Sequence, residues 1–180
     1  AKHQSQYPVY FQPDVDGHMA VYGAGGTGKS VALRTLAIAA AITPRGGPVQ
    51  VYALDFGSAG MRLLEALPHV GAVIDGDDTE RVTRLFGRLS AIVEGRAERY
   101  AAVRAGNIGE YRTLSGNHSE PRILVLIDGG GPFRQQYEFT TDGVYAAFLQ
   151  LLADGRTVGV HIVMTADRPG AIHSAVASSL

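Results

Sequence analysis

The sequence predicts an α/β fold, with a mostly parallel sheet carrying helices on both faces, and three observations support this prediction. Residues 23–30, Gly-Ala-Gly-Gly-Thr-Gly-Lys-Ser, form a complete phosphate-binding loop between an apolar stretch and a helix-forming stretch. Apolar runs alternate with helix-forming segments through the rest of the chain. One such run, residues 122–128, ends in the acid Asp128, as a buried strand would that presents a carboxylate at the edge of a parallel sheet.

The phosphate-binding loop predicts a nucleotide site with Mg²⁺. Its glycines let successive backbone N–H groups turn inward around phosphate oxygens without a Cβ in the way. Lys29 would place a charge at the β- and γ-phosphates, Ser30 would offer its hydroxyl to Mg²⁺, and the following helix would aim its positive end at the same point. The candidate binding residues of this loop are Gly23, Ala24, Gly25, Gly26, Thr27, Gly28, Lys29, Ser30 and Val31.

The elements around the loop follow from apolar runs bounded by turn residues. Residues 1–15 are predicted as an edge strand or lid, and residues 16–180 as a single domain. Pro68 closes a short predicted helix, and Asp55 ends a predicted strand. In chain order the first half contains a strand at 18–22, a helix at 31–42, a strand at 49–54, a short helix at 59–67 and a strand at 70–74.

A long amphipathic helix is predicted next, from about residue 79 to Arg104. Apolar residues recur at three- and four-residue steps from Val82 to Tyr100. The turn-forming residues 75–79 can cap its start. Its arginines lie mostly off the apolar stripe, which favours a solvated face; they are Arg81, Arg84, Arg88, Arg96, Arg99 and Arg104.

Asp128 is the predicted second Mg²⁺ contact, beside the hydroxyl of Ser30. A helix at 144–152 and a strand at 159–164 complete the alternation. The whole is the P-loop NTPase architecture, and its nucleotide would lie at the carboxyl ends of the strands. There the loop, Asp128 and Thr165 are expected to converge.

Composition narrows the function classes. With 16 basic and 17 acidic residues the net charge is −1, which gives no overall attraction to nucleic acid or anionic membranes. The chain has no cysteine, so disulfides and thiolate metal sites are excluded. No apolar run approaches the roughly 20 residues that cross a bilayer. The first and last residues suggest a segment of a longer chain. The histidines His18, His69, His118 and His161 are expected at strand ends or turns rather than as metal ligands.

The aromatic residues before the first core strand allow two interpretations. Tyr7, Tyr10 and Phe11, with Pro8 and Pro13, could stack on an adenine. They could also pack on the core as part of an edge strand or lid, which is the commoner use of such a stretch.

Beyond the loop, the sequence resembles the FtsK/SpoIIIE group of P-loop ATPases, with a RecA-like fold, from about Asp16 to the end. The matching stretches are Asp55 after the second strand, Pro68-His69 before the third, Glu94 to Tyr100 in the long helix, Asn107 to Tyr111 after it, Gly159 to Val163 and Arg168-Pro169. The resemblance implies ATP with Mg²⁺ as the ligand and a hexamer in the full-length protein.

Within that family the chain is most similar to the tandem ATPase domains of the EccC/EssC group, the motors of type VII secretion. The stretches that carry this likeness are residues 126–134 and 165–177. The resemblance implies a cytoplasmic domain of a membrane-anchored protein. Its partners would be neighbouring ATPase domains, secretion-system components and small helical secreted substrates, with no nucleic acid.

Three positions depart from the family pattern. Gly129 stands where active members carry the glutamate that positions the attacking water, Asp167 where they carry a γ-phosphate-sensing glutamine, and Gly57 where they carry a lysine. Glu138 and Asp142 follow in what looks like loop sequence and are candidate substitute bases. Together the departures predict a degenerate site that binds Mg·ATP with weak or absent hydrolysis, so no residue is assigned as catalytic. The alternatives are an active FtsK-like DNA translocase domain and a protein-binding module with a vestigial nucleotide site.

Overall fold

Five parallel strands form one sheet in the computed structural model, which describes residues 10–42, 47–57, 59–177 and 179. The spatial order is β1-β5-β4-β2-β3, so the first strand lies at an edge. Each described strand pair is parallel, which confirms the α/β prediction. The strands are β1 (Met19–Tyr22), β2 (Val49–Asp55), β3 (Val70–Asp75), β4 (Arg122–Asp128) and β5 (Val160–Ala166).

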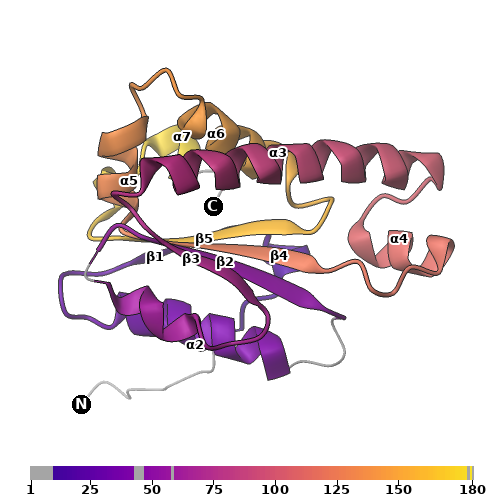
Figure 1. Cartoon of the computed structure of the whole chain (residues 1–180), viewed down its shortest axis with the longest axis horizontal. Helices are drawn as coiled ribbons and strands as arrows, with labels where there is room; N and C mark the ends of the chain where they lie inside the picture. Colours follow the sequence, from indigo (N-terminus) through magenta and orange to yellow (C-terminus); the bar gives the residue numbers. More distant parts are fainter. Residues whose placement is uncertain (1–9, 43–46, 58, 178, 180) are drawn as a thin grey trace, which may run out of the picture.

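Helices cover both faces of the sheet (Figure 1). One face carries α2 (Lys29–Ile42) with the 3-10 helix η2 (Gly60–Leu64), and the other carries α3 (Thr79–Ala102), α5 (Gly130–Tyr137), α6 (Val144–Asp154) and α7 (Ser174–Ala177). The remaining short elements are α1 (Pro13–Asp16), α4 (Ile108–Ser115) and η3 (Pro169–Ala171).

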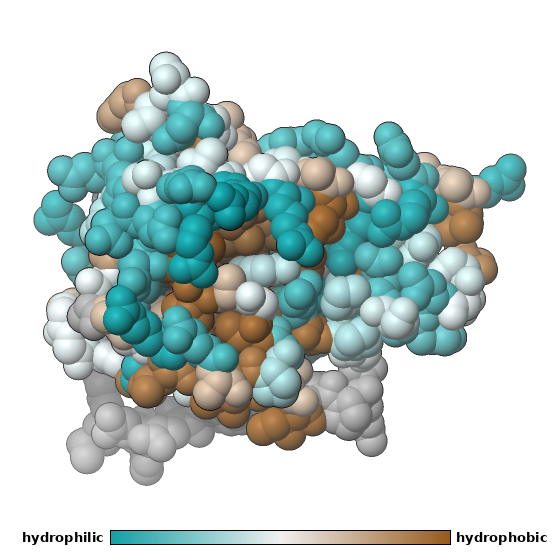
Figure 2. Space-filling view, viewed as in Figure 1, coloured by the Kyte–Doolittle hydropathy of each residue, from teal (hydrophilic) through white to brown (hydrophobic). Residues whose placement is uncertain are grey.

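The alternation of side chains along β4 divides the core in two. Leu124 and Leu126 pack with Leu33 of α2, whereas Ile123, Val125 and Ile127 belong to the larger cluster beneath α3, α5 and α6. This is the two-residue period of a strand that is buried on both faces. In the space-filling view, hydrophilic side chains dominate the half occupied by α3, and apolar ones gather over the half occupied by α2 and η2 (Figure 2).

The predicted helix at 59–67 is wrong in type and length. The chain there forms only the five-residue 3-10 helix η2. The Asp55 side chain accepts hydrogen bonds from the backbone N–H groups of Gly57 (3.0 Å) and Met61 (2.9 Å), and Ala59 adopts a left-handed φ of 58°. These constraints tie the segment to the end of β2 and hold it in a tight turn.

The prediction of a solvated arginine face fails at Arg96. This side chain is 2% exposed. It donates to the carbonyl oxygens of Val158 (2.9 Å) and Pro121 (2.7 Å) and forms an ion pair of 2.8 Å with Glu120. Arg96 therefore fixes α3 to the segments that precede β4 and β5.

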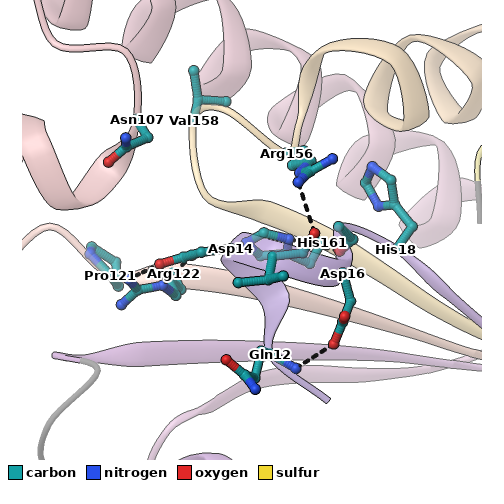
Figure 3. A network of polar contacts seen from close by, with 12 residues as sticks. Gln12, Asp14, Asp16, His18, Asn107, Pro121, Arg122, Arg156, Val158 and His161 are labelled. Atoms are coloured by element: carbon teal, nitrogen blue, oxygen red, sulfur yellow. Dashed lines mark hydrogen bonds and ion pairs between the residues drawn. The ribbon is translucent and has the colours of Figure 1, made fainter.

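The predicted N-terminal edge strand or lid lies mostly outside the described residues, as does Tyr7. Tyr10 is exposed, and Phe11 packs at the margin of the core beneath α2. Asp14 of α1 pairs with Arg122 at the start of β4, and Arg156 donates to the carbonyl of Val15 at 2.7 Å (Figure 3). In the described part of the chain, no helix is long and apolar enough to cross a bilayer.

Candidate nucleotide site

The carboxyl ends of three strands bring the predicted site residues together. The phosphate-binding loop leaves β1 at Tyr22, which is in register with Ala166 at the end of β5. The Gly23 N–H donates to the Ala166 carbonyl at 3.1 Å. Asp128 ends β4, the next strand across. The expected convergence of the loop, Asp128 and Thr165 is therefore confirmed.

The loop has the backbone that a phosphate cradle needs. Gly26 and Gly28 have φ values of 76° and 92°, which L side chains rarely adopt. A Cβ built on either glycine, or on Gly25, would meet no heavy atom within 4 Å, so the space beside the loop is open. The Thr27 hydroxyl donates to the Ala24 carbonyl at 2.8 Å and closes the turn.

Lys29 folds back over this loop. Its ammonium donates to the carbonyls of Gly23 (2.7 Å) and Ala24 (3.0 Å) and pairs with a carboxylate oxygen of Asp167 at 2.9 Å. Val31, in the first turn of α2, has an exposed side chain. Its backbone N–H lies in the first turn of the helix that follows the loop.

A chain of hydrogen bonds joins α2 to β4 and β5. The Ser30 hydroxyl donates to Asp128 Oδ2 at 2.5 Å, and the buried Thr165 hydroxyl donates to Asp128 Oδ1 at 2.7 Å. Thr165 Oγ1 also accepts from the Gly129 N–H at 2.9 Å. A serine hydroxyl beside a carboxylate is the hard-oxygen pair that Mg²⁺ takes in phosphate sites, so these residues fit a magnesium-bound nucleotide.

A side chain at position 57 would face the carboxylates of Asp55 and Asp128. A Cβ built on Gly57 would lie 3.5 Å from Asp55 Oδ1 and 3.6 Å from Asp128 Oδ2. A longer side chain here would therefore reach Asp128 beside the loop, whereas glycine leaves Asp55 bonded to the backbone of its own turn.

Comparison with known proteins identifies the family of this chain. The FtsK/SpoIIIE family model matches residues 2–179. This chain belongs to the FtsK/SpoIIIE family.

The FtsK/SpoIIIE domain described here is similar to proteins of ESX secretion systems. It is 36% identical over 155 residues to ESX-4 secretion system protein EccC4 of Mycobacterium tuberculosis, covering 84% of this chain and 12% of the relative. It is 33% identical over 159 residues to ESX-1 secretion system protein EccCb1 of Mycolicibacterium smegmatis, covering 84% of this chain and 26% of the relative. The chain thus spans about a quarter or less of these relatives.

Solved structures share the fold of this FtsK/SpoIIIE domain. Thermomonospora curvata EccC (ATPases 2 and 3), in complex with a signal sequence peptide, matches with a TM-score of 0.87 and 29% identity, covering 99% of this chain and 33% of that one. The cytoplasmic domain of the type VII secretion ATPase EccC from the same organism matches with a TM-score of 0.81 and 30% identity over 91% of this chain and 19% of that one.

Gly129 is constrained by its backbone and by Phe56. Its φ is 96°, and a Cβ there would lie 3.1 Å from Phe56 Cβ and 3.2 Å from the Phe56 carbonyl carbon and oxygen. These contacts are tighter than side chains normally make. A glutamate at this position of the FtsK/SpoIIIE domain would require the backbone of Phe56 or Gly129 to move.

The two candidate substitute bases are engaged locally. Glu138, the residue that caps the end of α5, accepts from Arg134 at 2.8 Å. Asp142 accepts from the Thr140 hydroxyl (2.9 Å) and the Val144 N–H (3.0 Å), which secures the start of α6. The first therefore ends a helix that the sequence analysis missed, and the second lies in the predicted loop.

Three histidines form hydrogen bonds between neighbouring segments near the amino-terminal ends of the strands, away from the phosphate loop. His161, within β5, donates from Nδ1 to the Gly17 carbonyl at 2.8 Å, since a carbonyl can only accept. His18 Nδ1 accepts from the Ile162 N–H at 2.9 Å. His69 contacts the Ala37 carbonyl at 2.9 Å. Among the described residues, no group of three histidines and acids lies close enough to hold a metal.

A groove lies at this amino-terminal edge of the strands. Its volume is about 370 Å³. Its apolar lining comes from the N-terminal segment, α2 and the first residues of β2 and β4, and includes Phe11, Val15, Leu36, Ala40, Val49 and Leu124. Asp14, Arg122 and His161 are among its polar lining residues. Sequence analysis did not find this groove, because its residues come from separate segments spread along the chain from Phe11 to His161.

Proposed function

We propose that this domain binds Mg·ATP and hydrolyses it slowly or not at all, within the motor ATPase of a type VII secretion system. One observation carries the proposal. The Asp128 carboxylate accepts hydrogen bonds from Ser30 and Thr165. The Ser30 hydroxyl and this carboxylate, the two groups that would hold Mg²⁺, therefore lie beside an open phosphate loop, while Gly129 provides no carboxylate next to them.

The residues of the site suit nucleotide binding without further rearrangement of the fold. The loop N–H groups and the start of α2 would cradle the phosphates, Lys29 would turn its charge to the β- and γ-phosphates, and Ser30 and Asp128 would hold Mg²⁺. Bound Mg²⁺ would neutralise phosphate charge. What the chain lacks at position 129 is a carboxylate that could orient water for attack.

The length and domain content of the relatives support a role for this domain between neighbouring domains. The relatives are four to eight times longer than the matched part, and a similar solved structure contains two ATPase domains in one chain. We propose that bound ATP sets the geometry between this domain and its neighbours, in the cytoplasmic part of a membrane-anchored protein that assembles as a hexamer. It would thereby regulate export of small helical proteins.

Ligand-linked stability tests the binding claim. ATP at 100 times its Kd would add about 2.7 kcal/mol to the free energy of unfolding, which raises the melting temperature of a chain of this size by about 5–10 °C. We expect this shift with Mg·ATP in the wild type and not in Lys29→Ala. Arg88→Ala is the matched control, because it removes one exposed cation from α3.

The outcomes separate three classes of function. A shift in the wild type and in Arg88→Ala, without phosphate release, supports the proposal. A shift accompanied by steady phosphate release and by DNA binding would instead identify an active translocase domain. No shift at any ATP concentration would leave a protein-binding module with a vestigial loop.

A further inference from the structure

We propose that Asp167 is a specificity-determining residue of the nucleotide site, competing with the terminal phosphate of ATP for the Lys29 ammonium. This inference rests on the proposed nucleotide binding and goes one step further. It assigns a side chain that weakens binding of triphosphates more than binding of diphosphates.

The Asp167 carboxylate lies beside the Lys29 ammonium, the positive charge that would bind the phosphates. Asp167 Oδ1 lies 2.9 Å from Lys29 Nζ, and the Lys29 ammonium uses its other two donors on the Gly23 and Ala24 carbonyls. All three of its N–H groups are therefore engaged. A γ-phosphate that contacts Lys29 has to displace at least one of these acceptors, and the carboxylate is the one that carries charge.

Neighbouring backbone holds Asp167 in this position. Ala166, immediately before it, ends β5 and accepts a hydrogen bond from the Gly23 N–H at 3.1 Å. The start of the loop and the end of β5 are thus joined one residue from the carboxylate. Thr165, one residue earlier, is bonded to Asp128. The segment that carries Asp167 is consequently positioned by both halves of the nucleotide site.

The exposure of the Lys29 and Asp167 side chains determines how large a change in nucleotide affinity we expect. The Asp167 side chain is 76% exposed and that of Lys29 is 14% exposed, so water screens the pair and the effect is modest. The carboxylate would also repel a triphosphate more strongly than a diphosphate, because the triphosphate carries one more negative charge at that end. We expect Asp167→Asn to raise the affinity for Mg·ATP about three- to tenfold and the affinity for Mg·ADP by less.

Calorimetric titration of ATP and ADP, each with Mg²⁺, into the wild type, Asp167→Asn and Asp154→Asn tests this inference. Asp154 is exposed at the end of α6, so its variant controls for net charge. The difference between Asp167→Asn and the wild type should shrink as salt is raised, since screening weakens exposed ion pairs. Circular dichroism melting of each variant checks that the fold is intact.

Each outcome decides a separate point. A selective gain for ATP in Asp167→Asn alone supports the inference. Unchanged or weaker ATP binding in this variant, or an equal gain for ATP and ADP, would overturn it while leaving nucleotide binding in place. If neither the wild type nor Asp167→Asn binds either nucleotide, the proposed function fails, and with it this inference.

Discussion

Gly129 shows how a single residue can set the chemistry of this site. It carries a left-handed backbone and lies against Phe56, so the position cannot accept a side chain without strain. The local backbone therefore disfavours a glutamate at position 129, so placing a carboxylate there would take more than a change of one side chain.

Gly129→Glu should consequently fail to create an active ATPase. We expect no gain in phosphate release and a loss of about 1–3 kcal/mol in the free energy of unfolding, because a side chain is forced into a left-handed conformation against Phe56. Urea unfolding with a phosphate-release assay measures both. Gly143→Glu, at a left-handed glycine with open space around its Cβ, controls for the backbone effect. A hydrolysing Gly129→Glu variant would show that position 129 alone limits activity.

Thr165 is the residue that orients the Asp128 carboxylate. Thr165→Val keeps the shape but removes the donor to Asp128 and the acceptor for the Gly129 N–H, so a buried carboxylate and a partly buried N–H group each lose a partner. We expect a loss of about 1–3 kcal/mol in stability and a weaker dependence of ATP affinity on Mg²⁺. Titrations with Mg²⁺ and with excess chelator test the second effect. An unchanged Mg²⁺ dependence would mean that Thr165 has only a structural role.

The local motifs of the site, and the convergence of the loop with Asp128 and Thr165, could be predicted from sequence, but two other contacts could not. The phosphate loop and Asp128 follow from short patterns with a physical reason for each residue. The contact between Gly129 and Phe56 and the ion pair between Lys29 and Asp167 depend on which strands are neighbours, which a single sequence does not reveal.

At the scale of elements, the five strands were predicted within two residues of their observed ends, because each is an apolar run bounded by turn or polar residues. Helices α4 and α5 were missed. The sequence of α5 begins Gly-Gly-Pro after Gly129, which reads as a turn. Packing of Phe133 and Tyr137 in the main core stabilises this helix, so tertiary contacts override its weak local propensity.

The docking of α3 depends on Arg96. Arg96→Met should lower the free energy of unfolding by about 2–3 kcal/mol, because it removes the donor to the Val158 and Pro121 carbonyls and leaves the mostly buried Glu120 carboxylate paired with the more exposed Arg99. Arg88→Met removes an exposed arginine from the same helix and should change stability by less than about 0.5 kcal/mol. Urea denaturation compares the two. Equal stabilities would contradict the account of how α3 is held.

For the molecule as a whole, the buried histidine pair makes stability depend on pH. Burial, the neighbouring His161 and Arg156 lower the pKa of His18 to about 4, and burial also lowers the pKa of His161 despite its bond to Gly17 and the charge of Asp14. Both rings are therefore neutral in the folded protein at neutral pH.

The unfolded chain binds protons on these histidines near their ordinary pKa of 6.5, above the folded values. The stability contributed by His18 is therefore complete above pH 6.5 and is lost as the pH falls from 6.5 to about 4. The loss is on the order of 2–3 kcal/mol. His18→Asn, whose amide oxygen can accept from Ile162, should flatten this pH profile in urea denaturation, whereas His118→Asn, in an exposed loop, should not. Parallel profiles for all three proteins would contradict the assignment.

The central claim is that the assembled site holds Mg·ATP without turning it over. The most direct test is to incubate the purified domain with Mg·ATP, separate protein from free nucleotide, and quantify the ATP and ADP that remain bound, with Lys29→Ala in parallel. The account predicts intact ATP, bound in a one-to-one ratio by the wild type and absent from the variant. Wild-type protein that carries no nucleotide, or that converts the ATP to ADP at the 1–10 s⁻¹ or so of ordinary enzymes, would contradict it.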